Sequence, residues 1–335
     1  MKKLIKWMGR IFLLAVLFIS GMAIYSYQAW QQLEKAPIAR TDTPLFVVAR
    51  GDTSGHLISR LSAKPVPSYM RKLWLRFHPE LAAVRQGTYK FAPETSVREA
   101  LHSIVNGDTY RLQVTLVEGL RLSDWLARLA KAEYLEVTLT GQSEADIAQH
   151  LGLDNDKVEG WLLPETYSYT PGDTDLSILQ RAYDDMASFL DKEWPERQSD
   201  LPITTPYEAL ILASIIEKET GIAEERPLIA SVFVNRMRVG MRLQTDPTVI
   251  YGMGEDYDGN IRKKDLQTHT PYNTYMIDGL PPSPIAMASK EAIMATLHPL
   301  DSAYYYFVAM GEGRHYFSKS LPEHNNAVRR YILKR

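Results

Sequence analysis

The residue of this sequence whose placement most suggests chemistry is Glu219. It follows Leu212, Ile215 and Ile216 at the i, i+3, i+4, i+7 spacing of one helical face, so its carboxyl group is expected on an apolar stripe. Glu217 points nearly the opposite way, because two residues turn a helix by about 200°. Burial and the negative end of the helix dipole both disfavour an ionised carboxylate and raise its pKa. A glutamate with a raised pKa is suited to act as a general acid near neutral pH.

The helix that carries this carboxylate is predicted over residues 205–221. Thr205 and Glu208 form a capping box at its start, and Pro206 occupies its first position. Gly221 is expected to end it. A structural interpretation, in which the carboxylate caps its own helix end or pairs with an arginine, stays open on these residues alone.

Polar and aromatic residues suited to a carbohydrate cleft follow this helix. A second helix is predicted over residues 224–238. Asp246 and Pro247 then mark another helix start, with Asp246 as its N-cap and Pro247 at its first position. Aromatic rings can cover the apolar faces of a sugar, while amides and hydroxyls fix its hydroxyl groups. The residues expected to contact substrate are Gln244, Thr245, Asp246, Tyr251, Tyr272, Asn273, Tyr275 and Glu217.

Other common active-site chemistries lack their motifs in this sequence. No His-Glu-x-x-His or other metal-ligand spacing occurs, no Gly-x-Ser-x-Gly elbow, and no glycine loop that would bind phosphate. The absence of cysteine excludes thiolate metal sites and a cysteine nucleophile. The formal net charge of −2 gives no indication of nucleic-acid binding. The sequence therefore predicts neither a metal nor a cofactor. The scattered histidines of its last third are His269, His298, His315 and His324.

The N-terminus predicts a membrane anchor. Residues 1–10 are basic, whereas residues 11–32 carry no charge and are about long enough to cross a hydrocarbon core of roughly 30 Å. A cleavable signal peptide is the alternative, but the nearest small-residue cleavage pattern, Ser20–Ala23, lies inside the apolar run. The basic cluster is expected to stay cytoplasmic. The chain would then be a single-pass protein of the inner (cytoplasmic) membrane, with its catalytic domain in the periplasm or extracytoplasmic space.

The rest of the chain is predicted to be α+β and to begin with two versions of one small unit. Each version has a short apolar strand, a glycine turn and an amphipathic helix, over residues 45–61 and again over residues 114–129. A further strand is predicted over residues 86–91, and a capped helix over residues 95–108. These units resemble LysM-like modules, which implies binding to glycans that contain N-acetylglucosamine. A spacer or packing role is the alternative.

The predicted domain boundaries follow from these elements. The LysM-like module is expected over residues 40–112, and the second unit or connection over residues 113–150. Residues 151–335 are expected to form a mixed α/β catalytic domain with its acid at a helix end. A rigid, aromatic-rich loop over residues 159–167 and a helix over residues 176–190 belong to that domain.

Several blocks of this sequence together resemble the endolytic murein transglycosylase family, also called MltG- or YceG-like. The resemblance covers nearly the whole chain, including the anchor and the LysM-like region. Glu219-Thr220 is also similar to the Glu-Ser pair of other lytic transglycosylases, which favours Glu219 over Glu217. The blocks that carry the resemblance are residues 159–167, 213–220, 245–248, 272–275, 279–282 and 306–308.

The resemblance implies cleavage of the β-1,4 bond between N-acetylmuramic acid and N-acetylglucosamine in peptidoglycan, without water. Glu219 would protonate the leaving oxygen and then accept the proton of the muramoyl C6 hydroxyl, which closes onto C1 to give a 1,6-anhydro end. Oriented dipoles from groups such as Gln244, Asn273 and nearby tyrosines would stabilise the developing oxocarbenium ion. The implied partners are peptidoglycan glycan strands, the membrane and peptidoglycan synthases, with the enzyme terminating the elongation of nascent strands.

Two other functions stay open. One is a muramidase-type hydrolase in which Asp246 or Glu217 activates water, and its product would carry a reducing end. The other is a membrane-anchored, non-catalytic scaffold that binds peptidoglycan. An acid on an apolar stripe favours an enzyme over this scaffold, because a silent module needs no such group.

Overall fold

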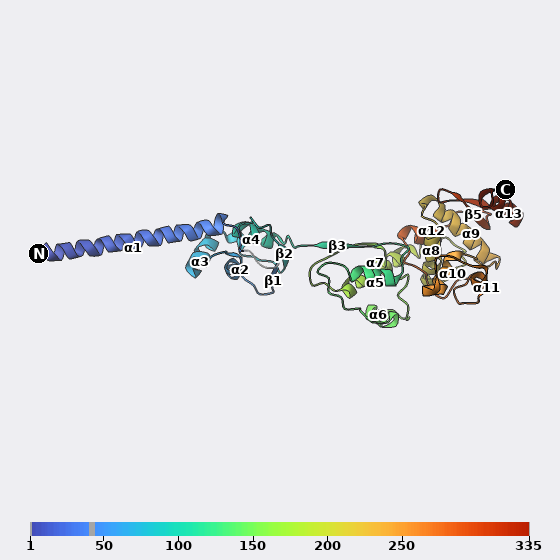
Figure 1. Ribbon diagram of the computed structural model, residues 1–335, viewed down its shortest axis with the longest axis horizontal. Coiled ribbons are helices and arrows are strands. Elements are labelled where there is room, and N and C mark those ends of the chain that lie inside the picture. The colour runs from blue at the N-terminus through green and yellow to red at the C-terminus, as the bar shows by residue number, and fades with distance from the viewer. Residues whose placement is uncertain (1, 40–43, 335) are drawn as a thin grey trace. The chain divides into compact units, whose positions relative to one another are not determined.

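The computed structural model describes residues 2–39 and 44–334. The chain divides into two compact units, an N-terminal unit of residues 1–112 and a C-terminal unit of residues 113–335 (Figure 1). The predicted start of the LysM-like module at Arg40 and the predicted end of the catalytic domain at Arg335 lie outside the described residues. Within the described part, the strands form three two-stranded sheets, so helices provide most of the packing.

The chain begins with one long helix, α1 (Lys2–Lys35). It contains the predicted anchor, and within the described residues it is the helix long and apolar enough to cross a membrane. Most of its apolar side chains are exposed, but Ala29 and Leu33 are buried in the N-terminal unit. The helix therefore continues without interruption from the apolar run into the core of a folded unit.

The N-terminal unit packs helices around an antiparallel pair of strands, β1 (Leu45–Val48) and β2 (Gly87–Lys90). Its register pairs Leu45 with Lys90 and Val48 with Gly87. The strand and helix predicted over residues 86–91 and 95–108 are confirmed by β2 and α4. The helices of this unit are α2 (Ser54–Leu61), α3 (Ser68–Phe77), the 3-10 turn η1 (Pro79–Leu81) and α4 (Val97–Asn106).

The C-terminal unit opens with a strand, a glycine turn and a helix, as the sequence predicts. Strand β3 (Leu112–Leu116) pairs with β4 (Glu165–Tyr169), and helix α5 (Leu122–Leu129) follows the turn at Gly119. Helix α6 (Glu144–Leu151) and the long helix α7 (Asp175–Glu193) complete this part.

The second part of this unit is built around helix α8 (Pro206–Glu219). All eight residues from Ala209 to Ile216 are buried, so this helix is apolar on every side, as expected of a central helix. The predicted stripe is thus one face of a helix whose middle, residues 209–216, is covered on every side. The surrounding elements are η2 (Ala223–Glu225), α9 (Arg226–Arg238), α10 (Asp246–Met253), η3 (Gly254–Asp256), α11 (Lys263–Gln267), α12 (Lys290–Leu297), β5 (Tyr306–Gly311), β6 (Arg314–Ser318) and α13 (Leu321–Tyr331).

The start of α8 agrees with the prediction, but its end does not. Thr205 and Glu208 form the reciprocal capping box, with Pro206 as the first helical residue. The helix ends just before the predicted glycine: its C-cap is Thr220, which is already extended at φ −146° and ψ 135°, and Gly221 follows without the positive φ of a glycine stop. Glu219 is therefore the last helical residue, at the point where the chain leaves the core.

A glycine in the loop before β4 is required by its surroundings. Gly160 has φ +84°, and a Cβ there would lie 2.3 Å from the side chain of Pro284. Its amide also donates to Sδ of Met287 at 3.2 Å. The loop and the Pro284 segment can pack this closely only because residue 160 has no side chain.

We expect Gly160→Ala to destabilise the C-terminal unit more than Gly141→Ala. Both positions have positive φ, but Gly141 (φ +77°) has open space around its Cα. Each substitution should cost roughly 1–2 kcal/mol of backbone strain. The contact with Pro284 should add about 1–3 kcal/mol for Gly160→Ala alone. Thermal unfolding of the two variants measures the difference, and equal melting temperatures would contradict the packing described here.

Candidate active site

Glu219 meets its main polar partner where the end of α8 approaches the start of α10. The hydroxyl of Thr245 donates a short hydrogen bond to Oε1 of Glu219. Burial is the largest influence on this carboxyl group and raises its pKa, as the sequence predicts, while the bond from Thr245 acts in the opposite direction. The nearby negative charge of Asp246 raises the pKa further.

Two further buried threonines, Thr248 and Thr274, hold the backbone of Thr245 in place. The amide of Thr245 donates to Oγ1 of Thr274 at 3.1 Å, and Oγ1 of Thr248 donates to the Thr245 carbonyl at 2.8 Å. Thr248 and Thr274 are themselves joined through their hydroxyls at 2.8 Å. Because all three are almost completely buried, the network fixes the donor that faces Glu219.

Asp246 lies next to this network and has a different position in its helix from the one predicted. The N-cap of α10 is Thr245, and Asp246 is the first helical residue. The prediction that Asp246 is the N-cap is therefore wrong by one position. Its exposed carboxylate instead accepts a hydrogen bond from the Tyr275 hydroxyl at 2.7 Å. Burial, followed by this bond, raises the pKa of Tyr275, so its proton stays on the phenol.

Gln244, the residue before Thr245, has an exposed side chain. Its backbone has φ +50°, a left-handed conformation that is uncommon for a residue with a side chain. The backbone N–H of Gln244 donates to the Thr274 carbonyl at 3.1 Å. Such strain tends to persist where a loop is held for a functional purpose. The structure thus brings Glu219, Gln244, Thr245, Asp246 and Tyr275 into one region.

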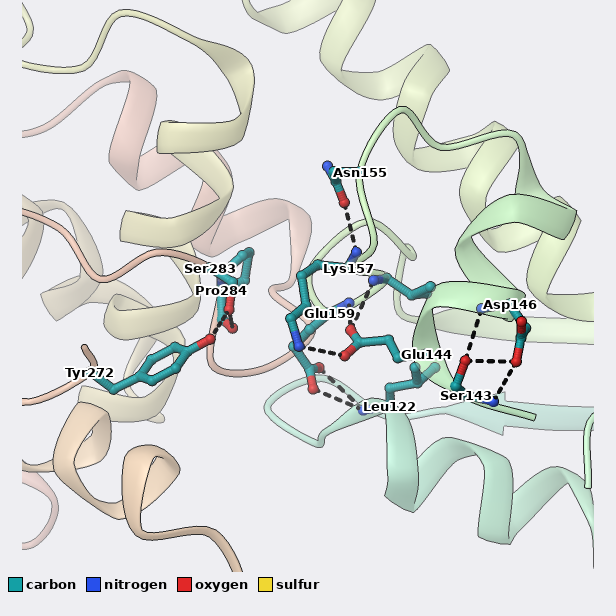
Figure 2. Close-up of polar contacts among 11 residues, drawn as sticks. Leu122, Ser143, Glu144, Asp146, Asn155, Lys157, Glu159, Tyr272, Ser283 and Pro284 are labelled. Atoms are coloured by element: carbon teal, nitrogen blue, oxygen red, sulfur yellow. Dashed lines mark hydrogen bonds and ion pairs between the residues drawn. The ribbon is translucent and has the colours of Figure 1, made fainter. Parts of the chain in front are cut away.

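Two of the predicted aromatic residues lie against one another. The rings of Tyr251 and Tyr272 have centroids 4.9 Å apart, and Arg121 lies over the Tyr251 ring at 4.7 Å. The Tyr272 hydroxyl bonds to that of Ser283 at 2.6 Å (Figure 2). Tyr251 also lines a hollow of about 410 Å³ beside α5, whose other walls include Glu159.

Asn273 and Glu217 are occupied with structural contacts. Asn273 is 1% exposed, and its side-chain amide donates to the carbonyls of Asp265 and Leu266 in α11 and of Thr268 just after it; its contact with substrate stays a prediction. The Glu217 side chain is 5% exposed and forms an ion pair with Arg226 at 3.0 Å. It also accepts from the amide of Ser289, the N-cap of α12, at 2.9 Å. The arginine pairing that the sequence left open for Glu219 thus belongs to Glu217.

Two basic residues near Glu219, His315 and Arg236, were not found from the sequence. The charges of His315 and Arg236 both act to lower the Glu219 pKa. Nδ1 of His315 contacts Glu225 at 2.8 Å, and Nη1 of Arg236 donates to the Leu243 carbonyl at 2.6 Å. In the sequence His315 is one of several scattered histidines, because nothing in the local sequence indicates that β6 lies near the end of α8.

A second buried carboxyl group lies in the loop before β4. Burial raises the pKa of Glu159 to about 8, although the amide of Leu122 donates to both of its oxygens at 3.1 and 3.2 Å. Figure 2 shows how Glu144 supports the same loop by accepting from the amides of Val158 and Glu159. These contacts attach the loop to the first turn of α5. Within the described residues, no group of three histidine or acidic side chains could hold a metal ion.

Comparisons with known proteins identify the class. A sequence model of the YceG-like family matches residues 46–330. The chain is 33% identical over 264 residues to the endolytic murein transglycosylase of Bacillus subtilis (strain 168), a match that covers 73% of this chain and 72% of that protein. The protein of that name from Streptococcus pneumoniae serotype 2 (strain D39 / NCTC 7466) is 32% identical over 183 residues, which covers 52% of this chain and 32% of the pneumococcal protein.

A solved structure agrees with these matches. The crystal structure of a YceG-like protein from Listeria monocytogenes aligns with a TM-score of 0.52 and 26% identity, and covers 84% of this chain and 97% of that one. The chain belongs to the YceG-like family.

The hydrogen bond from Thr245 leads to a testable shift in the Glu219 pKa. Thr245→Val removes a donor that favours the ionised carboxylate, so the pKa should rise further. A bond to a charged group contributes about 1.5–3 kcal/mol, which corresponds to roughly one to two pH units. Carbon-13 NMR titration of labelled glutamate, with Glu219→Gln used to assign the signal, measures the change.

Thr248→Val is the matched control for this titration. It deletes a buried hydroxyl of the same network that does not contact Glu219, so it should lower stability and leave the Glu219 pKa closer to its original value. A downward shift in Thr245→Val, or equal shifts in both variants, would exclude Thr245 as the residue that sets this pKa.

Proposed function

We propose that this protein is an endolytic lytic transglycosylase of peptidoglycan. It would cleave the β-1,4 bond between N-acetylmuramic acid and N-acetylglucosamine within glycan strands and leave 1,6-anhydro ends. The observation that carries the proposal is a single carboxyl group, Glu219, which has a raised pKa and a fixed hydroxyl partner. The relatives of this chain that are named endolytic murein transglycosylases support the same function.

One carboxyl group is sufficient for this reaction. Protonated Glu219 donates its proton to the glycosidic oxygen as the bond from that oxygen to C1 of the muramoyl residue breaks. The resulting carboxylate then accepts the proton of the C6 hydroxyl as that oxygen bonds to C1, which restores the acid. Proton transfer by a positioned group contributes about 10²–10⁴ in rate. The hydrogen bond from Thr245 supports the ionised state halfway through this cycle.

The raised pKa determines the direction of the pH dependence. Glu219 must be protonated when the substrate binds, so activity is present below its pKa and falls as the pH rises through it. Burial extends the active range upward, towards neutral pH.

Hydrolysis is the competing reaction at this site, and Asp246 would be its base. Asp246 is exposed and hydrogen-bonded to Tyr275, whereas Glu217 is engaged by Arg226 and Ser289. Activation of water by Asp246 would yield reducing ends in place of anhydro ends. The products therefore distinguish the two mechanisms.

We propose that α1 anchors the enzyme in the inner membrane, with its basic N-terminus in the cytoplasm and both units outside. Its length, exposed apolar surface and position at the N-terminus support this arrangement. The strand and helix pairs of residues 45–61 and 112–129 support LysM-like glycan contacts. A tether of this kind would confine the enzyme to nascent strands near the membrane, where peptidoglycan synthases work.

We expect Glu219→Gln to abolish turnover and keep the fold, because the two side chains are nearly isosteric and only the transferable proton is lost. Mass spectrometry of peptidoglycan strands digested by the full-length protein measures the result. Anhydro-muramoyl products from the wild type and none from Glu219→Gln are the expected outcome. Reducing-end products from the wild type would contradict the transglycosylase and direct attention to Asp246.

We expect Glu217→Gln to lower the stability of the protein and to leave its catalytic rate nearly unchanged. It leaves the Arg226 guanidinium buried without its counter-charge, and breaking such a pair costs about 3 kcal/mol. The melting temperature should fall, while turnover per folded molecule at low temperature should stay close to that of the wild type. Loss of turnover without loss of stability would assign Glu217 a direct part in the reaction.

A further inference from the structure

Helix α3 carries a row of apolar side chains that the N-terminal unit leaves uncovered. Tyr69, Leu73 and Phe77 are 47%, 44% and 65% exposed, and their i, i+4, i+8 spacing places them along one side of the helix. The residues that face the core of the unit are instead Met70 and Trp74. We call the three exposed residues the α3 stripe.

Cations border this stripe. Lys72 and Arg76 are exposed and follow the same spacing, about 60° around the helix from Tyr69 and Leu73 on the side away from the core. The sequence of α3, SYMRKLWLRF, contains no acidic residue. An apolar row beside a basic row is typical of helices that lie in the interface of an anionic membrane.

Both ends of the α3 stripe lie against α1. The Tyr69 hydroxyl is 3.4 Å from Oγ of Ser26, and the rings of Phe77 and Trp30 meet edge to face with centroids 5.7 Å apart. The predicted anchor extends to residue 32, but Ala29 and Leu33 are buried in the N-terminal unit, so the stretch of α1 that lipid can surround ends near Ser26. Ser26 and Trp30 therefore lie where α1 enters the folded unit, at the end of the segment available to the bilayer.

The joint between α1 and this unit is rigid. Leu33 is completely buried, and Glu34 accepts from Nε1 of Trp74 at 2.8 Å and from Nη1 of Arg98 at 3.0 Å. His78 contacts the same carboxylate at 2.8 Å. Since Trp74 belongs to α3, the height of α3 above the membrane is set by α1 and cannot change without breaking these contacts.

A hollow beside α1 adds further cations to the same unit. It has a volume of about 950 Å³ and is lined by Tyr25, Gln28 and Ala29 of α1. Lys35 and Lys64 also line it. A lipid headgroup phosphate would find positive charge here as well as along α3.

We propose that α3 lies on the surface of the membrane that α1 spans, with the α3 stripe in the interface and Lys72 and Arg76 against anionic lipid phosphates. This inference rests on the proposed anchor. In this arrangement the contact of α3 with the membrane surface fixes the orientation of the N-terminal unit, and α1 fixes its distance from the bilayer.

The absence of cysteine allows a direct test with single labelled cysteines in the full-length protein. Leu73→Cys and Phe77→Cys carry an environment-sensitive fluorophore, in nanodiscs of phosphatidylcholine with phosphatidylglycerol and a lipid-borne quencher. Val47→Cys on β1 is the matched control, because Val47 is a similarly exposed apolar residue (53%) of the same unit. Ile19→Cys, inside the apolar run, reports on the anchor itself.

We expect loss of fluorescence at residues 19, 73 and 77 and none at residue 47. Replacing Lys72 and Arg76 by glutamate should reduce the fraction of molecules whose α3 stripe contacts the membrane by at least roughly an order of magnitude. Quenching at residue 19 with residues 73 and 77 as bright as residue 47 would overturn the inference and leave the anchor in place. Labels at residues 73 and 77 that are shielded from water but not quenched would also overturn it, in favour of a protein partner. If residue 19 is not quenched, α1 does not span the membrane, and the proposed contact of α3 with the membrane is rejected as well.

Discussion

The carboxyl group at the end of α8 is the constraint on which the site depends. A helix as completely buried as α8 can bring a glutamate to the edge of the core only if a fixed polar group meets it, because an unpaired buried carboxyl group is costly. Thr245 supplies that group, and two further buried threonines hold it. The start of α10, the Thr274 loop and the end of α8 are thereby joined in one arrangement.

Three glutamates with low exposure have different roles because their partners differ. Glu217 is neutralised by Arg226 and bonds to the N-cap of α12. Glu159 accepts from the first turn of α5 and keeps a raised pKa. Glu219 has a hydroxyl as its hydrogen-bond partner in place of a counter-charge, and burial raises its pKa, which favours the protonated form that a general acid needs.

The joint between α1 and the N-terminal unit leaves no flexible linker between the two. Leu33 is buried in the core of that unit, and Glu34 accepts from Nε1 of Trp74, so the helix and the folded module form one body. An anchor in α1 would therefore hold this module at a defined height above the bilayer.

The sequence by itself determined the local features: the capping box at Thr205, the apolar positions of α8, the strand and helix pairs, and the place of Glu219 on the apolar face at the end of its helix. These depend on spacing and on residue type, which are visible within a few neighbours. Tertiary structure alone decided that Glu217 pairs with Arg226, that Asn273 supports a loop, and that His315 lies near Glu219. It also decided that Thr245, and not Asp246, caps α10. Each of these depends on which distant segment supplies a hydrogen-bond partner. The spacing of residue types along the chain does not predict which distant segments meet.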